Sequence, residues 1–130
     1  MVKKTITYKN YNDVEVTEDF YFNLSKAEVM EMELSKDGGL AEQLQRIIDA
    51  QDAPAIIKEF KDFVLKSYGE KSPDGKRFMK NDEIRDNFAA TEAYSIIFME
   101  IATNTDAATS FVNGVIPPQE KDPKAVMSAQ

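Results

Sequence analysis

The sequence contains no cysteine and no histidine among its 130 residues. Without cysteine, the chain can form no disulfide and can offer no thiolate nucleophile. Without histidine, it lacks the usual general base near neutral pH and the commonest ligand of transition metals. A Ser-His-Asp or Cys-His catalytic site therefore cannot be built, and we expect no enzyme activity, no metal and no cofactor.

Long hydrophobic runs are also missing. No stretch of about 18 apolar residues occurs, so the sequence predicts no membrane-spanning helix. The first ten residues, MVKKTITYKN, contain no apolar segment of signal-peptide length, and we therefore expect a cytoplasmic protein. The formal net charge is -7 and the pI is about 4.6, so we expect no nucleic-acid partner.

The N-terminal residues have the pattern of a β-hairpin. Polar and apolar side chains alternate over 2–9 and 14–22, and the turn-forming tetrapeptide Asn10-Tyr11-Asn12-Asp13 separates the two runs. An isolated hairpin is marginally stable, so one of its faces must cover a core. We expect that face to consist of Ile6, Tyr8, Val14, Val16, Phe20 and Phe22.

Helical spacing of apolar residues dominates the rest of the chain. Ser25-Lys26-Ala27-Glu28 is a capping box that starts a helix reaching about Leu34, and a second helix is expected over 40–50. Four more helix starts are indicated by Pro54, by Asn81 or Asp82, by Thr91 and by Asp106, with Gly114 ending the last helix.

These elements define the expected architecture. It is an α+β, mainly α fold with the hairpin followed by about five or six helices. Residues 1–116 form a single domain, with the hairpin in 1–24 and the helices in 25–116. The remaining residues, 117–130, are rich in proline and charge and predict a flexible tail.

The stretch GEKSPDGKR, residues 69–77, is the part of the chain most similar to a nucleotide-binding loop. Its spacing is wrong for a phosphate-binding loop, because five residues and not four separate Gly69 from Gly75. In addition, Arg77 stands where a serine or threonine is needed, and the loop follows a helix where a strand is required. We predict that Gly69 caps that helix, that Ser72-Pro73-Asp74-Gly75 is a type I turn, and that Phe78 anchors a short strand within 76–80.

The same region is the only basic one. Residues 66–80 carry five basic and two acidic side chains, a local charge of 5 - 2 = +3. A solvated surface explains this charge, and an acidic partner remains an alternative.

Two helices carry more apolar residues than one buried face requires. Ile96 and Met99 lie to one side of the stripe Tyr94, Ile97, Phe98 and Ile101, and Val29 and Met32 form a second stripe on the helix after Ser25. Such residues are either additional core or a surface for a partner helix. Val29, Met32, Ile96 and Met99 are therefore the candidate partner-binding residues.

Four segments together resemble a known family. The order EVTEDFYFNLSKAEVMEMELS, GGLAEQLQRIIDAQD, FKDFVLKSYGEKSPDGKRF and TEAYSIIFMEIATNTDAATSFVNGVIP is similar to the small tail assembly chaperones of long-tailed, siphovirus-type bacteriophages of Gram-positive hosts. The resemblance covers roughly residues 3–117. Its most specific parts are TEDFYFNL, SYGEKSPDGKRF, and TEAY followed by FVNG.

The resemblance implies a non-enzymatic role in virion morphogenesis. Such a chaperone binds the phage tape-measure protein in the host cytoplasm, keeps it soluble and promotes tail tube assembly. Contact with the major tail tube protein through a longer, frameshifted form, and self-association, are further partners that it suggests. The alternative is a structural tail or head–tail connector subunit that stays in the virion, and a nucleotide-dependent enzyme is a third hypothesis that depends on the loop alone.

Overall fold

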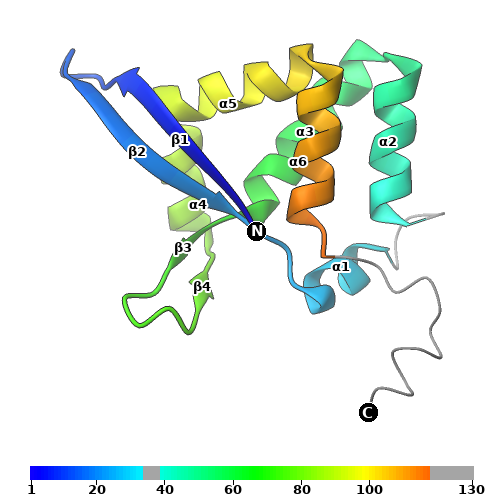
Figure 1. The fold of residues 1–130 in the computed structure, drawn as a ribbon, viewed down its shortest axis with the longest axis horizontal. Coiled ribbons are helices and arrows are strands. Elements are labelled where there is room, and N and C mark those ends of the chain that lie inside the picture. Colours follow the sequence, from blue (N-terminus) through cyan, green and yellow to red (C-terminus); the bar gives the residue numbers. More distant parts are fainter. Residues whose placement is uncertain (34–38, 118–130) are drawn as a thin grey trace.

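The computed structural model describes residues 1–33 and 39–117. Within these ranges the chain forms four strands and six helices, arranged as in Figure 1. The strands are β1 (Val2–Lys9), β2 (Glu15–Phe22), β3 (Tyr68–Lys71) and β4 (Phe78–Met79). The helices are α1 (Lys26–Glu33), α2 (Leu40–Ala50), α3 (Ala53–Ser67), α4 (Asp82–Ala89), α5 (Glu92–Thr103) and α6 (Thr105–Val115). The predicted α+β, mainly α fold is confirmed; the expected end of the first helix at Leu34 and the tail beyond Pro117 lie outside the described residues.

The strands form one sheet in the order β1-β2-β3-β4, with neighbouring strands antiparallel. The predicted hairpin is present, and its eight residue pairs run from Val2 opposite Phe22 to Lys9 opposite Glu15. Strand β3 pairs with β2 only at Tyr21 and Phe22. Most of β2 therefore has β1 as its single neighbour, and the far end of the hairpin projects past α5 at the upper left of Figure 1.

Aromatic rings join the hairpin to the helices. Phe22 is fully buried, and its ring centroid lies 5.2 Å from that of Phe111 in α6 and 5.7 Å from that of Phe88 in α4. Phe20 is buried as expected, and Ile6 and Tyr8 pack against the core from β1. Val14 departs from the prediction because it lies before β2 begins, where no helix reaches it, and it is 53% exposed.

Side-chain caps begin most of the helices where local sequence signals predicted them. Ser25 Oγ accepts from the Glu28 N–H at 3.1 Å, and Glu28 Oε1 accepts from the Ser25 N–H at 2.9 Å. Asp52, Asn81 and Thr91 cap α3, α4 and α5 in the same way.

The boundaries of α6 differ from the prediction at both ends. Asn104, not Asp106, caps the helix, because Asn104 has an extended backbone and its side chain accepts from the Ala107 N–H at 3.0 Å. Gly114 lies within the helix and does not end it. A Cβ at Gly114 would stand 2.6 Å from Val2 Cγ2, so this glycine lets β1 approach α6 closely.

Gly69 has a different role from the predicted helix cap. Helix α3 ends at Ser67, and Gly69 is a residue of β3 that pairs with Tyr21 of β2. A Cβ at Gly69 would lie 2.7 Å from the Phe78 ring and 2.9 Å from the Met79 carbonyl oxygen. The absence of a side chain therefore allows β4 to fold back on β3, and the predicted strand within 76–80 is the two-residue β4.

Candidate binding groove

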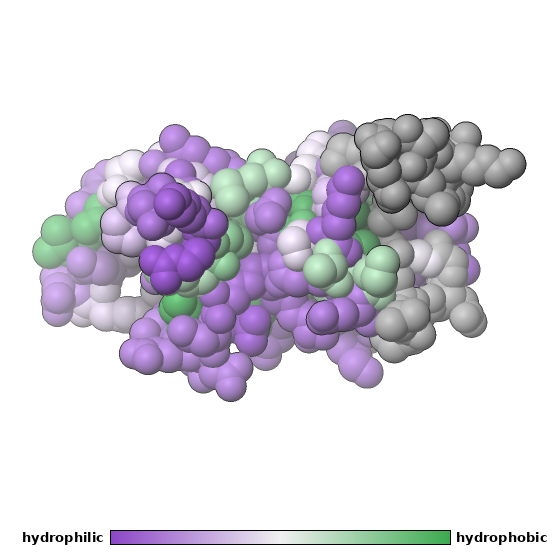
Figure 2. All heavy atoms as spheres, turned by 90° about the horizontal axis from the view of Figure 1, so that it is seen from below, coloured by the Kyte–Doolittle hydropathy of each residue, from purple (hydrophilic) through white to green (hydrophobic). Residues whose placement is uncertain are grey.

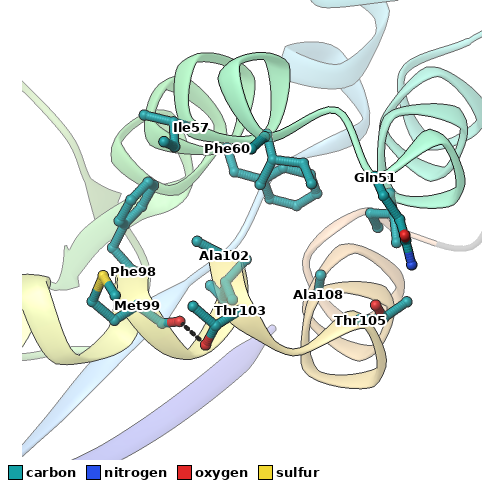
Figure 3. A pocket seen from close by; sticks show the side chains of 13 residues that line it. Gln51, Ile57, Phe60, Phe98, Met99, Ala102, Thr103, Thr105 and Ala108 are labelled. Atoms are coloured by element: carbon teal, nitrogen blue, oxygen red, sulfur yellow. Dashed lines mark hydrogen bonds between the residues drawn. The ribbon is translucent and has the colours of Figure 1, made fainter.

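An apolar groove of about 420 Å³ lies between α3 and α5 and extends to α2 and α6. Figure 3 shows side chains of α3 and α5 facing one another across it, with Gln51 and Thr105 at its far end. None of the residues that line this groove is charged. They are Ile48, Gln51, Ala53, Ile56, Ile57, Phe60, Phe98, Met99, Ile101, Ala102, Thr103, Thr105 and Ala108.

Buried residues form the floor of the groove and exposed ones its rim. Phe60 and Ile101 are almost completely inaccessible, whereas Ile57 is 54% exposed and Met99 is 53% exposed. Ile57 comes from α3 and Met99 from α5, so the two apolar rim residues stand on opposite walls. A partner that covered them would remove apolar surface from water, which favours binding.

The groove follows from the spacing of residues on its two walls. Helix α3 carries more apolar residues than α5 alone can cover, so Ile57 remains outside the core. On α5, the small side chain of Ala102 leaves room between the two helices. The Thr103 hydroxyl donates to the Met99 carbonyl oxygen at 2.6 Å, so this polar group on the wall is already satisfied (Figure 3).

The four candidate partner-binding residues do not come together in the structure. Met99 lines the groove, and Ile96, which is 39% exposed, lies on the same helix but outside the groove. Met32 is half-buried on α1, beside a separate shallow depression. Val29 is 3% exposed and belongs to the core, so it offers no surface to a partner.

Helix α1 turns Val29 toward the core and leaves Met30 exposed. Val29 was a candidate partner-binding residue but is buried, whereas the next residue, Met30, is 66% exposed. The capping box and Lys80 determine the orientation of this helix, because Lys80 Nζ donates to Glu28 Oε2 at 2.8 Å and to the Asn23 carbonyl at 2.6 Å. With Glu28 held on the side of α1 that faces Lys80, its neighbour Val29 faces the core.

The Lys80 contact also sets the pKa values of its members. Burial acts to raise the pKa of Glu28, but hydrogen bonds from Lys80 and from the Ser25 N–H outweigh it and hold that pKa below its usual value. Burial lowers the pKa of Lys80 in spite of the nearby carboxylate. The pair thus links β4 to the start of α1 and functions as a structural contact.

The loop 69–77 satisfies its own backbone hydrogen-bonding groups. The Gly75 N–H donates to the Ser72 carbonyl at 2.9 Å, which closes a β-turn, and Gly75 has a positive φ of 74°. The Arg77 N–H donates to Ser72 Oγ at 3.0 Å, and the Lys76 N–H donates to Asp74 Oδ1 at 3.0 Å. The hydroxyl of Ser72 and this N–H lower the pKa of Asp74. The N–H groups that would have to cradle a phosphate are therefore already used within the turn.

Three of the five basic side chains in residues 66–80 have partners in the same chain: Lys80 with Glu28, as above, and Lys66 and Lys71. Lys71 Nζ lies 4.1 Å from the centroid of the Tyr21 ring, and Lys66 Nζ lies 3.1 Å from Asp62 Oδ2. Figure 2, seen from the side of α1 and the β3–β4 hairpin, shows a mostly hydrophilic surface. These contacts favour the solvated-surface explanation of the local positive charge.

Residues 1–33 and 39–117 contain neither a cluster of metal-ligating side chains nor a helix that could span a membrane. Within those ranges no group of three or more acidic side chains is placed to hold a metal ion. Of the helices described above, none is both long and apolar enough to cross a membrane.

Comparison with known protein families gives a match over most of the chain. A family model described as phage tail assembly chaperone matches residues 1–124. No curated protein and no solved structure matches the chain.

Proposed function

The chain belongs to the phage tail assembly chaperone family, and we propose that it acts by binding the tape-measure protein of its phage. In this proposal the phage is of the siphovirus type and infects a Gram-positive host. The protein binds its client in the host cytoplasm, keeps it soluble until the tail tube forms around it, and is not an enzyme. The family match is to assembly chaperones, so it supports this function over that of a virion subunit.

The uncharged groove between α3 and α5 is the observation that carries the proposal. A tape-measure protein is long and mainly helical, and its apolar helix faces need cover before the tube encloses them. An amphipathic helix presents such residues at i, i+3, i+4 and i+7, which is the pattern that a groove between two helices accepts. Met99 and Ile57 would contact the client helix from opposite walls.

The groove suits a client that must be released. Fully burying one large aliphatic side chain contributes about 1.5–3 kcal/mol. A groove of about 420 Å³ has room for only a few such side chains, and the cost of ordering the partner is subtracted from their contribution. Weak or moderate affinity for each segment is therefore expected, which suits release during assembly.

The net charge supports solubility of the complex. The chain carries a formal charge of -7, and the groove accounts for none of it. Covering the groove with a client thus leaves the charged surface exposed to water. Such a surface opposes association between complexes and so suits a protein that keeps an apolar client in solution.

Co-purification with segments of the tape-measure protein tests the proposal. We expect the full chain to co-elute with at least one helical segment and to raise its soluble yield. Met99→Asp and Ile57→Asp, which place a charge on each wall, should weaken this binding by at least about tenfold, because the charge would have to be desolvated in the complex.

Two exposed apolar residues outside the groove provide matched controls. Ile96→Asp makes the same kind of change on α5, and Met30→Asp makes it on α1. Both should fold and bind the client like the wild-type protein. Equal loss of binding in all four variants would exclude the groove as the site, and failure of the wild-type chain to bind any segment would exclude the tape-measure protein as the client.

A further inference from the structure

We propose that the projecting β1–β2 hairpin joins copies of this chain, with the β1 edge of one copy pairing with the β2 edge of the next. This inference does not depend on the identity of the client. The hydrogen bonds within the hairpin determine which of its backbone groups remain available to a partner.

Alternate residues of each strand direct their backbone groups away from the hairpin. The Asn10 N–H donates to the Val14 carbonyl at 2.9 Å, so the hydrogen-bonded pairs in this register are those of even-numbered residues. The N–H and C=O groups of the odd-numbered residues must therefore point outward. Tyr21 confirms the direction, since it is the odd-numbered residue of β2 that pairs with Gly69 of β3.

Both outer edges are open along the projecting part of the hairpin. On β1 the outward residues there are Thr5, Thr7 and Lys9, and on β2 they are Glu15, Thr17 and Asp19. In the described part of the chain, their backbone groups have no hydrogen-bonded partner. Two open edges of this kind form a template for strand addition unless the protein protects them.

Charge determines which edges can pair. Strand β1 carries three lysines and no acidic residue, whereas β2 carries two glutamates and one aspartate and no basic residue. Pairing two β2 edges would place acidic residues together, and pairing two β1 edges would bring two lysine-rich strands together. The β1 edge of one copy and the β2 edge of another are complementary.

The register of the hairpin itself can continue across this contact. It would place Lys9 of one copy opposite Glu15 of the next, Thr7 opposite Thr17, and Thr5 opposite Asp19. Within each hairpin the Thr5 hydroxyl already donates a hydrogen bond to Asp19, and the Thr7 hydroxyl already shares one with Thr17. These four residues would therefore contribute backbone pairing, and Lys9 and Glu15 would form the new ion pair. Lys9 and Glu15 are exposed, and neither side chain has an ion-pair or hydrogen-bonded partner among the described residues. Lys9 and Glu15 lie opposite each other within the hairpin but form no ion pair there, so both side chains remain available for an intermolecular pair.

Residues at the end of the hairpin add apolar surface to the same contact. Tyr11 is 79% exposed and Val14, across the turn, is also largely exposed. Continuing the register would bring the ends of two hairpins side by side and cover part of both residues. Because the two edges of a contact differ, copies join head to tail and form a ring or an open chain.

Sedimentation of the full chain over a range of concentrations tests this inference. The wild-type protein should associate as its concentration rises, and Lys9→Glu and Glu15→Lys should each raise the dissociation constant by roughly tenfold. Lys58→Glu, an equal charge change on the exposed surface of α3, should have no such effect. Each edge variant also places like charges opposite each other within its own hairpin, so circular dichroism must show that the hairpin still forms in all of them.

Mixing the two edge variants provides the decisive result. Glu at position 9 of one variant and Lys at position 15 of the other are again complementary, so the mixture should associate although each variant alone does not. Wild-type protein that sediments as a monomer throughout would overturn the inference, as would single variants that associate normally. Met99→Asp should still self-associate, so failure of the client hypothesis remains distinguishable from failure of this one.

Discussion

Replacing Gly69 by alanine tests how β3 and β4 close on one another. The new Cβ would lie 2.7 Å from Phe78 Cε2, which is about 0.8 Å inside a favourable carbon–carbon contact. The Phe78 ring can move, but the Cβ would also lie 2.9 Å from the Met79 carbonyl oxygen, which belongs to the paired strand. The clash therefore requires a shift of β4 itself.

The size of the stability change in Gly69→Ala follows from two opposing effects. Overpacking of this kind costs about 1–3 kcal/mol, while alanine in place of glycine within a strand recovers about 0.5–1 kcal/mol of conformational entropy. Because the clash includes a backbone oxygen of β4, the upper half of the overpacking range applies, and we expect Gly69→Ala to lower the free energy of unfolding by about 1–2.5 kcal/mol. Urea unfolding followed by circular dichroism measures it, and an unchanged m-value would show that only stability has changed.

A double-mutant cycle separates this clash from a general effect of removing glycine. Phe78→Ala removes the nearest ring, so Gly69→Ala should cost less in that background than in the wild-type protein. Gly75→Ala is the control, because no atom lies within 4 Å of its new Cβ. The stability lost in Gly75→Ala arises from the positive φ at this position and should not depend on Phe78. A Gly69→Ala variant as stable as wild type would refute the close packing of the two strands.

Two further predictions concern the ends of helices. Because the pKa of Glu28 is lowered, its contribution to stability is present above the unfolded-state pKa of about 4.5 and is lost as the pH falls through the lower folded-state value. Glu28→Gln should therefore be less stable than wild type at pH 6, and the difference should shrink toward pH 3. Urea unfolding at a series of acid pH values measures it. A difference that does not change with pH would show that the ionised Glu28 carboxylate does not contribute to stability. Asn104→Ala should cost about 1 kcal/mol because it removes the cap of α6. Asp106→Ala should cost less, and thermal unfolding compares the two.

Local signals were enough to predict most of the secondary structure. The alternation in the first 22 residues and the capping box at Ser25 involve only neighbouring residues, and both are found as expected. The role of Gly69 could not be predicted in the same way. Its strand exists because Tyr68 and Gly69 pair with Phe22 and Tyr21, which are far away in the sequence. A four-residue strand such as β3 is too short to show a recognisable pattern of its own when distant residues determine its pairing.

The groove was only partly predictable for a related reason. An excess of apolar residues on α5 indicated Met99, because a helix that is apolar on two sides has one side left after packing. The same reasoning failed for Val29, since Glu28 is held by Lys80, which follows β4 and is far away in the sequence. Ile57 shares the helical spacing of the buried Phe60 and Val64, so the sequence alone does not distinguish it from a core residue. The sequence identifies apolar excess but not the side of a helix on which its neighbours lie.

Helix α5 lies between the two proposed surfaces. Met99 faces the groove, whereas the next residue, Glu100, accepts a hydrogen bond from Lys4 of β1 at 2.7 Å. One side of the helix thus forms a wall of the groove, and another supports the base of the hairpin. The edge residues Lys9 and Glu15 lie at the far end of the hairpin, away from Lys4 and the groove. A client helix and a second copy would therefore occupy different surfaces, so several copies could bind along one long client while contacting each other through their hairpins.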